Sequence, residues 1–303
     1  MRADADESAK LAADRLGLRI SELVDAPSHH VAAALLQGVW RADSPDSVVN
    51  AALMTALAHA GNYVVGAYQG ERMVAAVVGF LGVGHLHSHV AGVDRTIRTR
   101  GIGFALKQHQ RAWALARSIT EVCWTFDPLV SRNAYFNLHK LGASATEYLP
   151  DFYGELADGI NLGDPTDRLY VRWRLESPAA VAAANGHPAD IDAVAMRAEG
   201  AAVLVDRVGP LGQFEAPSAE GWALGYEWPI VTGESLPRLR ADGRPLLVAV
   251  PEDIETLRGH DPGAATQWRY AVRGALAEAL DAGYRVDGFS RDGFYALAPG
   301  ERV

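Results

Sequence analysis

The stretch from 84 to 107, GHLHSHVAGVDRTIRTRGIGFALK, most constrains how this chain can fold. Its first part alternates His85, His87 and His89 with other residues, and a period of two is typical of a β-strand. The residues from 104 to 117 are rich in Ala, Leu, Lys, Gln and Arg, which favour a helix. The turn RTRGIG between them leaves the first backbone N–H groups of the helix free to face an anion. The stretch therefore predicts a strand, an anion-binding turn and a helix.

The composition limits the classes of partner open to this chain. Of its 303 residues 49% are hydrophobic and 21% are charged, and the formal net charge is −9. This charge disfavours general binding to nucleic acid or to an anionic membrane, although the cluster of Arg95, Arg98 and Arg100 can still bind a small anion. The single Cys123 excludes an intramolecular disulfide, and we find no leader or membrane-spanning run. We expect a soluble, cytoplasmic protein with no nucleic-acid or membrane partner, for which a homodimer is one possible assembly.

The remaining patterns predict an α/β fold in the first half of the chain. Residues 1–28 are weakly patterned and are expected to form a mobile lead-in. Ser44 and Pro45 are typical of the start of a helix. The expected order ααβββαβαβ has helices over 31–41, 46–59, 104–117 and 132–141, and strands over 63–68, 73–81, 85–90, 121–126 and 168–175. This order predicts a mixed sheet flanked by helices.

The second half of the chain predicts a smaller α+β domain. The segment before it carries Ala, Pro and Gly without periodicity, which is typical of a linker. The expected domains and linker are therefore 1–176, 177–190 and 191–303. One helix is expected from about 264 to 282, where apolar residues recur every four positions at Trp268, Val272, Leu276 and Leu280. Such a stripe is more typical of a hydrophobic core than of a ligand site.

The glycine turn can be compared with three phosphate-binding signatures. The Gly-Lys-Ser/Thr of a Walker A loop does not occur, and the Rossmann pattern fails because Leu106 stands where its third glycine belongs. The turn instead fits the pattern R-x-x-G-x-G, with Arg98, Gly101 and Gly103. Glycines allow the backbone to approach phosphate oxygens, and the N–H groups and the helix dipole together attract an anion.

This turn resembles the pyrophosphate loop of the GNAT acyltransferase superfamily. A second segment, EVCWTFDPLVSRNAYFNLHKLGA, supports the resemblance because Ala134, Lys140, Leu141 and Gly142 stand in the GNAT register. The resemblance covers about residues 30–175. The combination of LHSH, RTRGIG, WTFDPL, NAYFNLHKLGA and PTDR is similar to a long, two-part branch, some members of which resemble N-succinyltransferases that act on amino acids.

The resemblance implies that a primary amine of a small molecule, plausibly an amino acid, attacks an acyl-CoA thioester directly. Acetyl-CoA or succinyl-CoA would be the co-substrate, and no metal is expected. The resemblance assigns the backbone of Gly92 and Val93 to the pantetheine arm, and Asn133 or Asn137 to the opposite side of that arm. It assigns the pyrophosphate to the turn residues Arg98, Thr99, Arg100, Gly101, Ile102 and Gly103.

Two groups compete for the role of general base. His87 and His89 lie on the strand where GNAT enzymes often carry a base, and imidazole has a pKa near working pH. Asp127, just after the next expected strand, is the rival base or an anchor for the substrate ammonium. A histidine on a strand is more often a structural, hydrogen-bonded residue, so these interpretations stay open.

The general acid is less well defined. Many GNAT enzymes carry a tyrosine at the position that matches Leu138, and Ser131 stands where Asn is common. Tyr135 or Tyr153, or water, would then protonate the leaving thiolate. The missing tyrosine also supports a rival function, a non-catalytic acyl-CoA-binding or interaction protein. A third option is transfer from an acyl group on a carrier protein.

Two further patterns have a structural and a functional interpretation. Arg168 belongs to a loop that either docks the second domain or binds a carboxylate of the substrate in bidentate fashion. Alternating His85, His87 and His89 can supply zinc ligands from one face of a strand. No acidic or cysteine partner completes a zinc set near them, so we expect no metal there.

Overall fold

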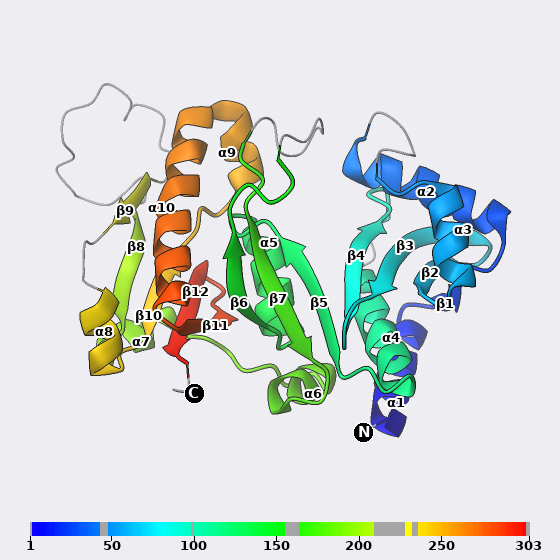
Figure 1. Ribbon diagram of the computed structural model, residues 1–303, viewed down its shortest axis with the longest axis horizontal. Coiled ribbons are helices and arrows are strands. Elements are labelled where there is room, and N and C mark those ends of the chain that lie inside the picture. Colours follow the sequence, from blue (N-terminus) through cyan, green and yellow to red (C-terminus); the bar gives the residue numbers. More distant parts are fainter. Residues whose placement is uncertain are drawn as a thin grey trace. The chain divides into compact units, whose positions relative to one another are not determined.

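The computed structural model of the chain describes residues 2–42, 48–97, 100–154, 164–208, 228–231 and 236–300 (Figure 1). The chain divides into two compact units. Among the described residues, the first unit comprises 2–124 and 172–188, and the second comprises 125–154, 164–171 and 189–300. The division therefore falls within two strands, β5 (Glu121–Phe126) and β7 (Arg168–Arg174). The expected domain bounds, which follow the chain without interruption, stay a prediction.

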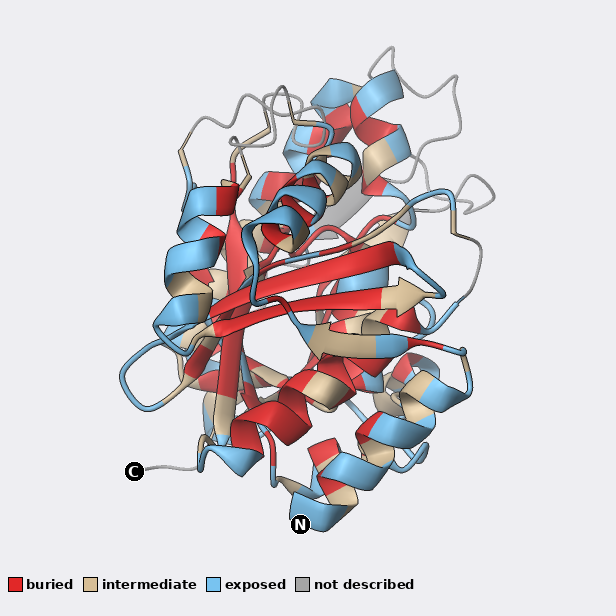
Figure 2. Cartoon of the chain, turned by 90° about the vertical axis from the view of Figure 1, so that its right-hand side faces the viewer, coloured by how far each residue is buried: buried red, intermediate tan, exposed pale blue. Residues whose placement is uncertain are grey.

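The first unit is built on a mixed sheet with the strand order β1-β2-β3-β4-β5. Its first four strands pair antiparallel, and β4 pairs parallel with β5. These four strands are β1 (Arg19–Glu22), β2 (Tyr63–Gln69), β3 (Arg72–Leu81) and β4 (Leu86–Val93). Most residues of β2 and β3 are buried on both faces, as expected of central strands covered by helices. Figure 2 shows these buried strands with helices on either side.

The helices of the first unit are α1 (Arg2–Asp14), α2 (Ala26–Trp40), α3 (Ala51–His59), α4 (Ile102–Ala116) and α6 (Pro178–Ala184). Asp25 caps the N-terminus of α2, because its carboxylate accepts a hydrogen bond from the backbone N–H of Ser28. Its residues Ala32 and Leu36 are buried in one core with Met54 of α3. The sequence prediction of strands and helices around the glycine turn is confirmed.

Three sequence expectations for this unit are wrong. The lead-in is ordered as α1 and β1; α1 packs against α4 through the small residues Ala5 and Ala9, which give little hydrophobic pattern. The helix α3 starts at Ala51 rather than near 46, because Asn50 caps it by accepting from the backbone N–H of Leu53. Ser44 and Pro45 lie outside the described residues. Residues 178–184 of the expected linker form α6.

The second unit contains a mixed sheet with the order β7-β6-β11-β12-β10-β8-β9. The strands other than β7 are β6 (Ser144–Leu149), β8 (Ala202–Val208), β9 (Trp228–Val231), β10 (Leu246–Ala249), β11 (Tyr284–Phe289) and β12 (Phe294–Pro299). The helices are α5 (Ser131–Ala134), the π-helical turn η2 (Tyr135–Lys140), α7 (Ala193–Ala198), α8 (Leu236–Asp242), α9 (Ile254–His260) and α10 (Pro262–Asp281).

The long helix α10 confirms the expected core stripe. Trp268, Val272 and Leu276 are fully buried, and Leu280 is half-buried. The fold class predicted from the sequence, a mixed α/β sheet flanked by helices, is thereby confirmed. No helix in the described parts of the chain combines the length and apolar character needed to cross a membrane.

Candidate functional site

The strand β4 carries a bulge at the position of its last histidine. Val78 of β3 pairs with Val90, but the next residue of β3, Gly79, pairs with Ser88. His89 is therefore an extra residue without a cross-strand partner, which bends the strand and redirects its side chains. Within the described residues, β4 pairs with β5 only at its first two positions, so the rest of β4 lies outside that ladder.

His87 and His89 lie beside the ring of Phe80 from β3. The ring centroids of His87 and Phe80 are 4.9 Å apart with an interplanar angle of 27°, and those of His87 and His89 are 6.3 Å apart. Burial, followed by smaller effects of His89, His85 and Lys107, lowers the pKa of His87 to about 4. Burial also lowers the pKa of His89. Both imidazoles are therefore neutral at pH 7, which is the form that accepts a proton.

The glycine turn ends at an uncapped helix N-terminus. Gly101 is the N-cap of α4 with a φ of 101°, a left-handed conformation that glycine adopts without strain, and no side chain caps the helix there. The first hydrogen bond of α4 runs from the N–H of Ala105 to the carbonyl of Gly101. The backbone N–H groups of Ile102 and Gly103 therefore have no partner within the helix and can face an anion.

The start of the same turn is fixed by Asp94. Its carboxylate accepts hydrogen bonds from the backbone N–H and the hydroxyl of Thr96, each at 2.8 Å, and pairs with Arg72 at 2.5 Å. Arg100 is exposed, whereas Arg98 and Thr99 lie outside the described residues. The structure thus supports the turn and the helix end predicted for the pyrophosphate, and the roles of these three side chains stay a prediction.

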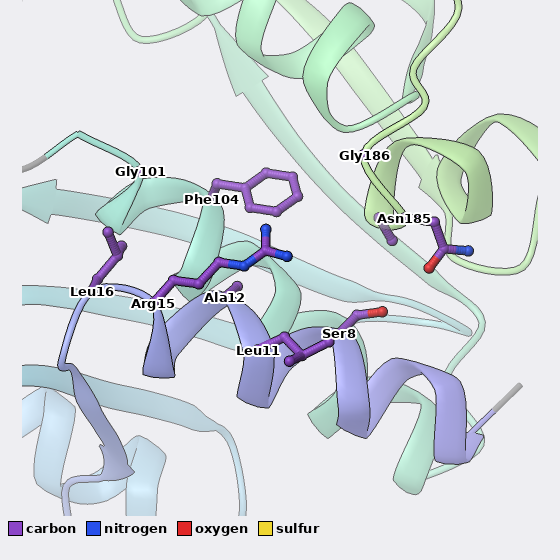
Figure 3. A pocket seen from close by; sticks show the side chains of 10 residues that line it. Ser8, Leu11, Ala12, Arg15, Leu16, Gly101, Phe104, Asn185 and Gly186 are labelled. Carbon is purple, nitrogen blue, oxygen red and sulfur yellow. The ribbon is translucent and has the colours of Figure 1, made fainter.

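A cavity of about 310 Å³ borders Gly101 at the N-terminal end of α4 (Figure 3). Arg15, just after α1, extends toward Phe104 of α4, and Asn185 lies on the other side of the cavity. Its remaining lining residues are Ser8, Leu11, Ala12, Leu16, Ala184 and Gly186. The cavity therefore offers one exposed cation, one aromatic ring and one amide next to the uncapped helix end. No local sequence pattern marks this cavity, because its walls come from three separate segments of the chain.

Gly92 and Val93 occupy the last two positions of β4. A Cβ atom on Gly92 would lie 2.8 Å from Cδ2 of Leu36 and 3.2 Å from Cγ1 of Val39, both on α2. Only glycine lets α2 approach the strand this closely. Ala76 and Ala75 of β3 pair with Gly92 and Val93, respectively.

Asp127 lies in the second unit, where two guanidinium groups enclose it. Arg269 donates to its two oxygens at 2.8 and 3.0 Å, and Arg258 donates at 2.6 Å. Burial alone would raise the pKa of Asp127, but the charges and hydrogen bonds of Arg269 and Arg258 hold it well below its ordinary value. Asp164 accepts from the same two arginines. A carboxylate held in this way is a poor proton acceptor, so the geometry favours a structural role for Asp127.

Arg168 also lies in the second unit, but its contacts differ from those of Arg258 and Arg269. Its guanidinium donates to the backbone carbonyl of Asp167 at 2.8 Å and lies 5.2 Å from the ring centroid of Tyr153. Arg273 pairs with the carboxylate of Asp167 at 2.6 Å. Within the described ranges, Arg168 forms no ion pair with a carboxylate, although only 8% of its surface is exposed. Its cluster, which also contains Arg258, Arg269 and Arg273, therefore has four guanidinium groups and three carboxylates, those of Asp127, Asp164 and Asp167.

Of the other predicted residues of the second unit, Asn133, Tyr135 and Asn137 lie on α5 or η2, and Tyr153 follows β6. Tyr135 stacks on His139 with a centroid distance of 4.4 Å, Asn133 is exposed and Asn137 is buried. Tyr153 hydrogen-bonds Thr125 at 3.3 Å. The expected helix over 132–141 begins at Ser131 without a side-chain cap, and from Tyr135 its turns widen to a π-helix, a feature often found at functional sites.

The predicted site residues are divided between the two units. His87, His89, Gly92, Val93 and the described residues of the glycine turn belong to the first. Asp127, Tyr135, Tyr153, Arg168 and the two asparagines belong to the second. No cluster of three or more histidine, cysteine or acidic side chains suited to a metal occurs in the part of the chain that the structure describes.

Comparisons with known proteins find a family match over the segment that carries β4 and α4. Residues 6–136 match the family model described as an acetyltransferase (GNAT) domain. No curated protein sequence matches the chain. This segment of the chain is therefore similar to a GNAT acetyltransferase domain, which supports the resemblance for these residues.

Solved structures with similar folds include three acetyltransferases. The ribosomal-protein-S18-alanine N-acetyltransferase from Escherichia coli has 14% identity and a TM-score of 0.43, covering 53% of this chain and 95% of that one. An aminoglycoside 6'-acetyltransferase type Ii has 17% identity and a TM-score of 0.42, with coverages of 52% and 98%. A GNAT family acetyltransferase from Elizabethkingia anophelis with acetyl-CoA bound has 14% identity and a TM-score of 0.40, with coverages of 52% and 99%.

Proposed function

We propose that the protein is an acyl-CoA-dependent N-acyltransferase that transfers an acetyl or succinyl group to the primary amine of a small molecule, with an amino acid as the expected acceptor. The observation that carries this proposal is the bulged β4 followed by the uncapped α4, both within the residues that match the acetyltransferase domain. We expect the protein to work in the cytoplasm.

The donor would bind along β4 and at the N-terminus of α4. The pyrophosphate would accept hydrogen bonds from the backbone N–H groups of Ile102 and Gly103, with Arg98, Thr99 and Arg100 as further ligands. The backbone of Gly92 and Val93 would pair with the pantetheine arm, and one N–H group of this strand would stabilise the oxyanion. The cavity beside Gly101 suits the nucleotide end of the same molecule.

The acceptor amine must lose a proton before or as it attacks the thioester carbon. His87 and His89 are the proposed bases, because both are neutral at pH 7 and exposed enough to be reached. The amine nitrogen would form a bond to the carbonyl carbon, the carbon–sulfur bond would break, and the thiolate would take a proton from Tyr135, Tyr153 or water. Asp127 is proposed only as a structural anchor.

The excess guanidinium of the second unit supports an acceptor or acyl group that carries a carboxylate. Arg168 is buried and has no carboxylate partner among the described residues, and a guanidinium in this state binds a carboxylate strongly. An amino acid and a succinyl group each carry one. We therefore propose Arg168 as the substrate-binding residue.

The test is release of free thiol from acetyl-CoA and from succinyl-CoA with a panel of amino acids, with product masses measured in parallel. Amine-dependent thiol release and a matching acylated product are expected. Binding of CoA without thiol release from any amine would instead support the non-catalytic alternative, for which Leu138 in place of tyrosine is the main argument. Weak CoA binding that tolerates Arg98→Ala would point to a carrier-protein donor.

A further inference from the structure

Lysine is scarce in this chain, and one of its lysines is buried. The chain has 28 lysine and arginine residues in total, and only three of them are lysines, namely Lys10, Lys107 and Lys140. Lys10 and Lys140 are exposed, whereas 8% of Lys107 is accessible. Burial of an ammonium group is costly unless a countercharge compensates it. Lys107 therefore requires an explanation that its two exposed counterparts do not.

Among the described residues, the surroundings of Lys107 contain hydrogen-bond acceptors and a ring but no countercharge. Its Nζ donates to Oγ of Ser88 and to Oε1 of Gln110, each at 3.0 Å, and lies 3.8 Å from the ring centroid of Trp124. No carboxylate pairs with it among the residues that the structure describes. Burial lowers the pKa of the Lys107 ammonium to about 7.

These contacts join three elements of the first unit at one point. Lys107 lies on α4, Ser88 lies on β4 next to the bulged residue His89, and Trp124 lies on β5. The pairing of β4 with β5 stops after His87↔Cys123, so Ser88 and Trp124 are the next residues on the two strands. The amine of Lys107 is thus fixed where the two strands cease to pair.

Neither an apolar residue nor an arginine would reproduce this arrangement. A methionine would fill a similar volume without a desolvation cost, but it would leave the hydroxyl of Ser88 without its donor. An arginine is longer, remains charged at all accessible pH values and donates in a fixed plane. In a chain that otherwise uses arginine almost throughout, a compact lysine here indicates a requirement for a small amine with several donors.

We propose that Lys107 is a positioning residue of the acyl-transfer site, which acts through Ser88 on the bulge that carries His89 and through Trp124 on the separation of β4 from β5. This inference rests on the proposed function. Loss of Lys107 would displace His87 and the bulged residue His89, while Gly92, Val93 and the N-terminus of α4 keep their geometry. The rate of the chemical step should therefore fall more than the affinity for the donor.

The experiment compares Lys107→Met, Lys107→Arg and Ser88→Ala with the wild type, and uses Lys10→Met on the exposed face of α1 as the control. Lys107→Met and Lys107→Arg should lower kcat about ten- to hundredfold with a KM for acyl-CoA within about twofold of the wild type. Ser88→Ala should show a smaller loss of the same kind, and Lys10→Met no loss. Ser88→Ala keeps the test decisive if the lysine variants fail to fold.

Two readouts separate positioning from simple packing. The ratio of kcat in the wild type to kcat in Lys107→Met should fall as pH rises through about 7, because the neutral amine no longer binds the ring of Trp124 as a cation. The imidazole resonances of His87 and His89 should also shift in Lys107→Met and stay unchanged in Lys10→Met. Unchanged kcat and unchanged imidazole resonances in folded Lys107→Met and Ser88→Ala would overturn the proposal.

The same set of measurements distinguishes failure of this inference from failure of the proposed function. If the wild type releases no thiol with any amine, the proposed function fails, but the imidazole resonances still test the effect of Lys107 on β4. If the wild type is active and both variants match it in kcat and in their spectra, only the positioning role fails.

Discussion

In the first unit a hydroxyl, an amide and an aromatic ring surround the buried Lys107, whereas in the second unit two carboxylates hold the buried Arg258 and Arg269. Burial without a countercharge lowers the pKa of Lys107 to about 7 and the pKa of His87 to about 4. Burial with a countercharge instead keeps Asp127 ionised. The first arrangement provides groups that are partly or wholly neutral at pH 7, and the second provides fixed charges.

This contrast assigns chemistry and architecture to different parts of the chain. The β4–α4 segment combines neutral imidazoles, a bulge and an open helix end. The aspartate–arginine cluster ties α9 and α10 to the strand end after β5 and to the segment before β7, all within the second unit. Arg168 is the exception in that cluster, because no carboxylate among the described residues forms an ion pair with it. It is therefore the charged residue of this cluster that we connect with a ligand.

The largest expected effect is on stability, from breaking the cluster. Arg269→Met should lower the free energy of unfolding by about 3–5 kcal/mol, because it leaves two buried carboxylates with too few donors. The matched control is Arg132→Met, which removes the exposed partner of Glu255 and should cost at most about 1 kcal/mol. Urea unfolding of both variants measures the difference. Equal losses in the two variants would mean that the cluster does not stabilise the second unit.

The next effect is on catalysis. His87→Ala or His89→Ala should lower kcat about 100-fold or more, according to which is the base. If His87 is the base, the wild-type kcat should lack an acid limb near 6.5, because burial leaves His87 unprotonated down to about pH 4. Steady-state kinetics between pH 5 and 9, as a working range for imidazole, provide the measurement. Full activity in both alanine variants would remove the histidines from the mechanism.

A smaller effect is expected from packing beneath β4. Gly92→Ala should destabilise the first unit by about 1–3 kcal/mol and raise the KM for acyl-CoA, because its methyl group would collide with Leu36 of α2. Gly38→Ala is the control, since it adds a methyl group to the same helix in open space and should be neutral or stabilising by up to about 1 kcal/mol. Thermal melts with and without CoA compare the two. A Gly92→Ala variant with wild-type stability and KM would show that α2 can move away from the added methyl group without disturbing β4.

The subtlest effect is a pH dependence of stability. The folded-state pKa of Lys107, about 7, lies below its ordinary value of 10.5, so the unfolded chain binds the proton more tightly between these two values. The stability of the wild type relative to Lys107→Met should therefore rise as pH increases from about 7 to about 10.5, and should stay flat below 7. Chemical denaturation of both proteins at pH 6 and pH 9 tests the sign. A constant difference would mean that Lys107 is not desolvated.

Local patterns predicted much of the first unit, because they depend on residues close together in the chain. The strand over 121–126, the helix after the glycine turn and the stop at Gly142 all follow from periodicity and turn residues. The helix α1 was missed because alanines carry its buried face. The cap at Asn50 was missed because Ser44 and Pro45 gave a stronger local signal.

The site was only partly predictable for a related reason. The histidine strand and the glycine turn have a spacing that can be recognised. Arg258 and Arg269 are more than 100 residues away from Asp127 in the chain, and no local pattern marks them as its partners. Lys107 was visible only as a helix-forming residue, since its burial depends on Ser88 and Trp124 from two different strands.

The most direct test of the central claim is a thermal-shift titration with CoA, acetyl-CoA and succinyl-CoA. A ligand at 100 times its Kd adds about 2.7 kcal/mol of stability, which corresponds to a rise of several degrees in Tm. We expect such a rise with the wild type, a larger Kd for Arg98→Ala, and the greatest rise with the acyl form that the enzyme uses. No change in Tm with any of the three would contradict the account, because the uncapped end of α4 would then not bind the donor.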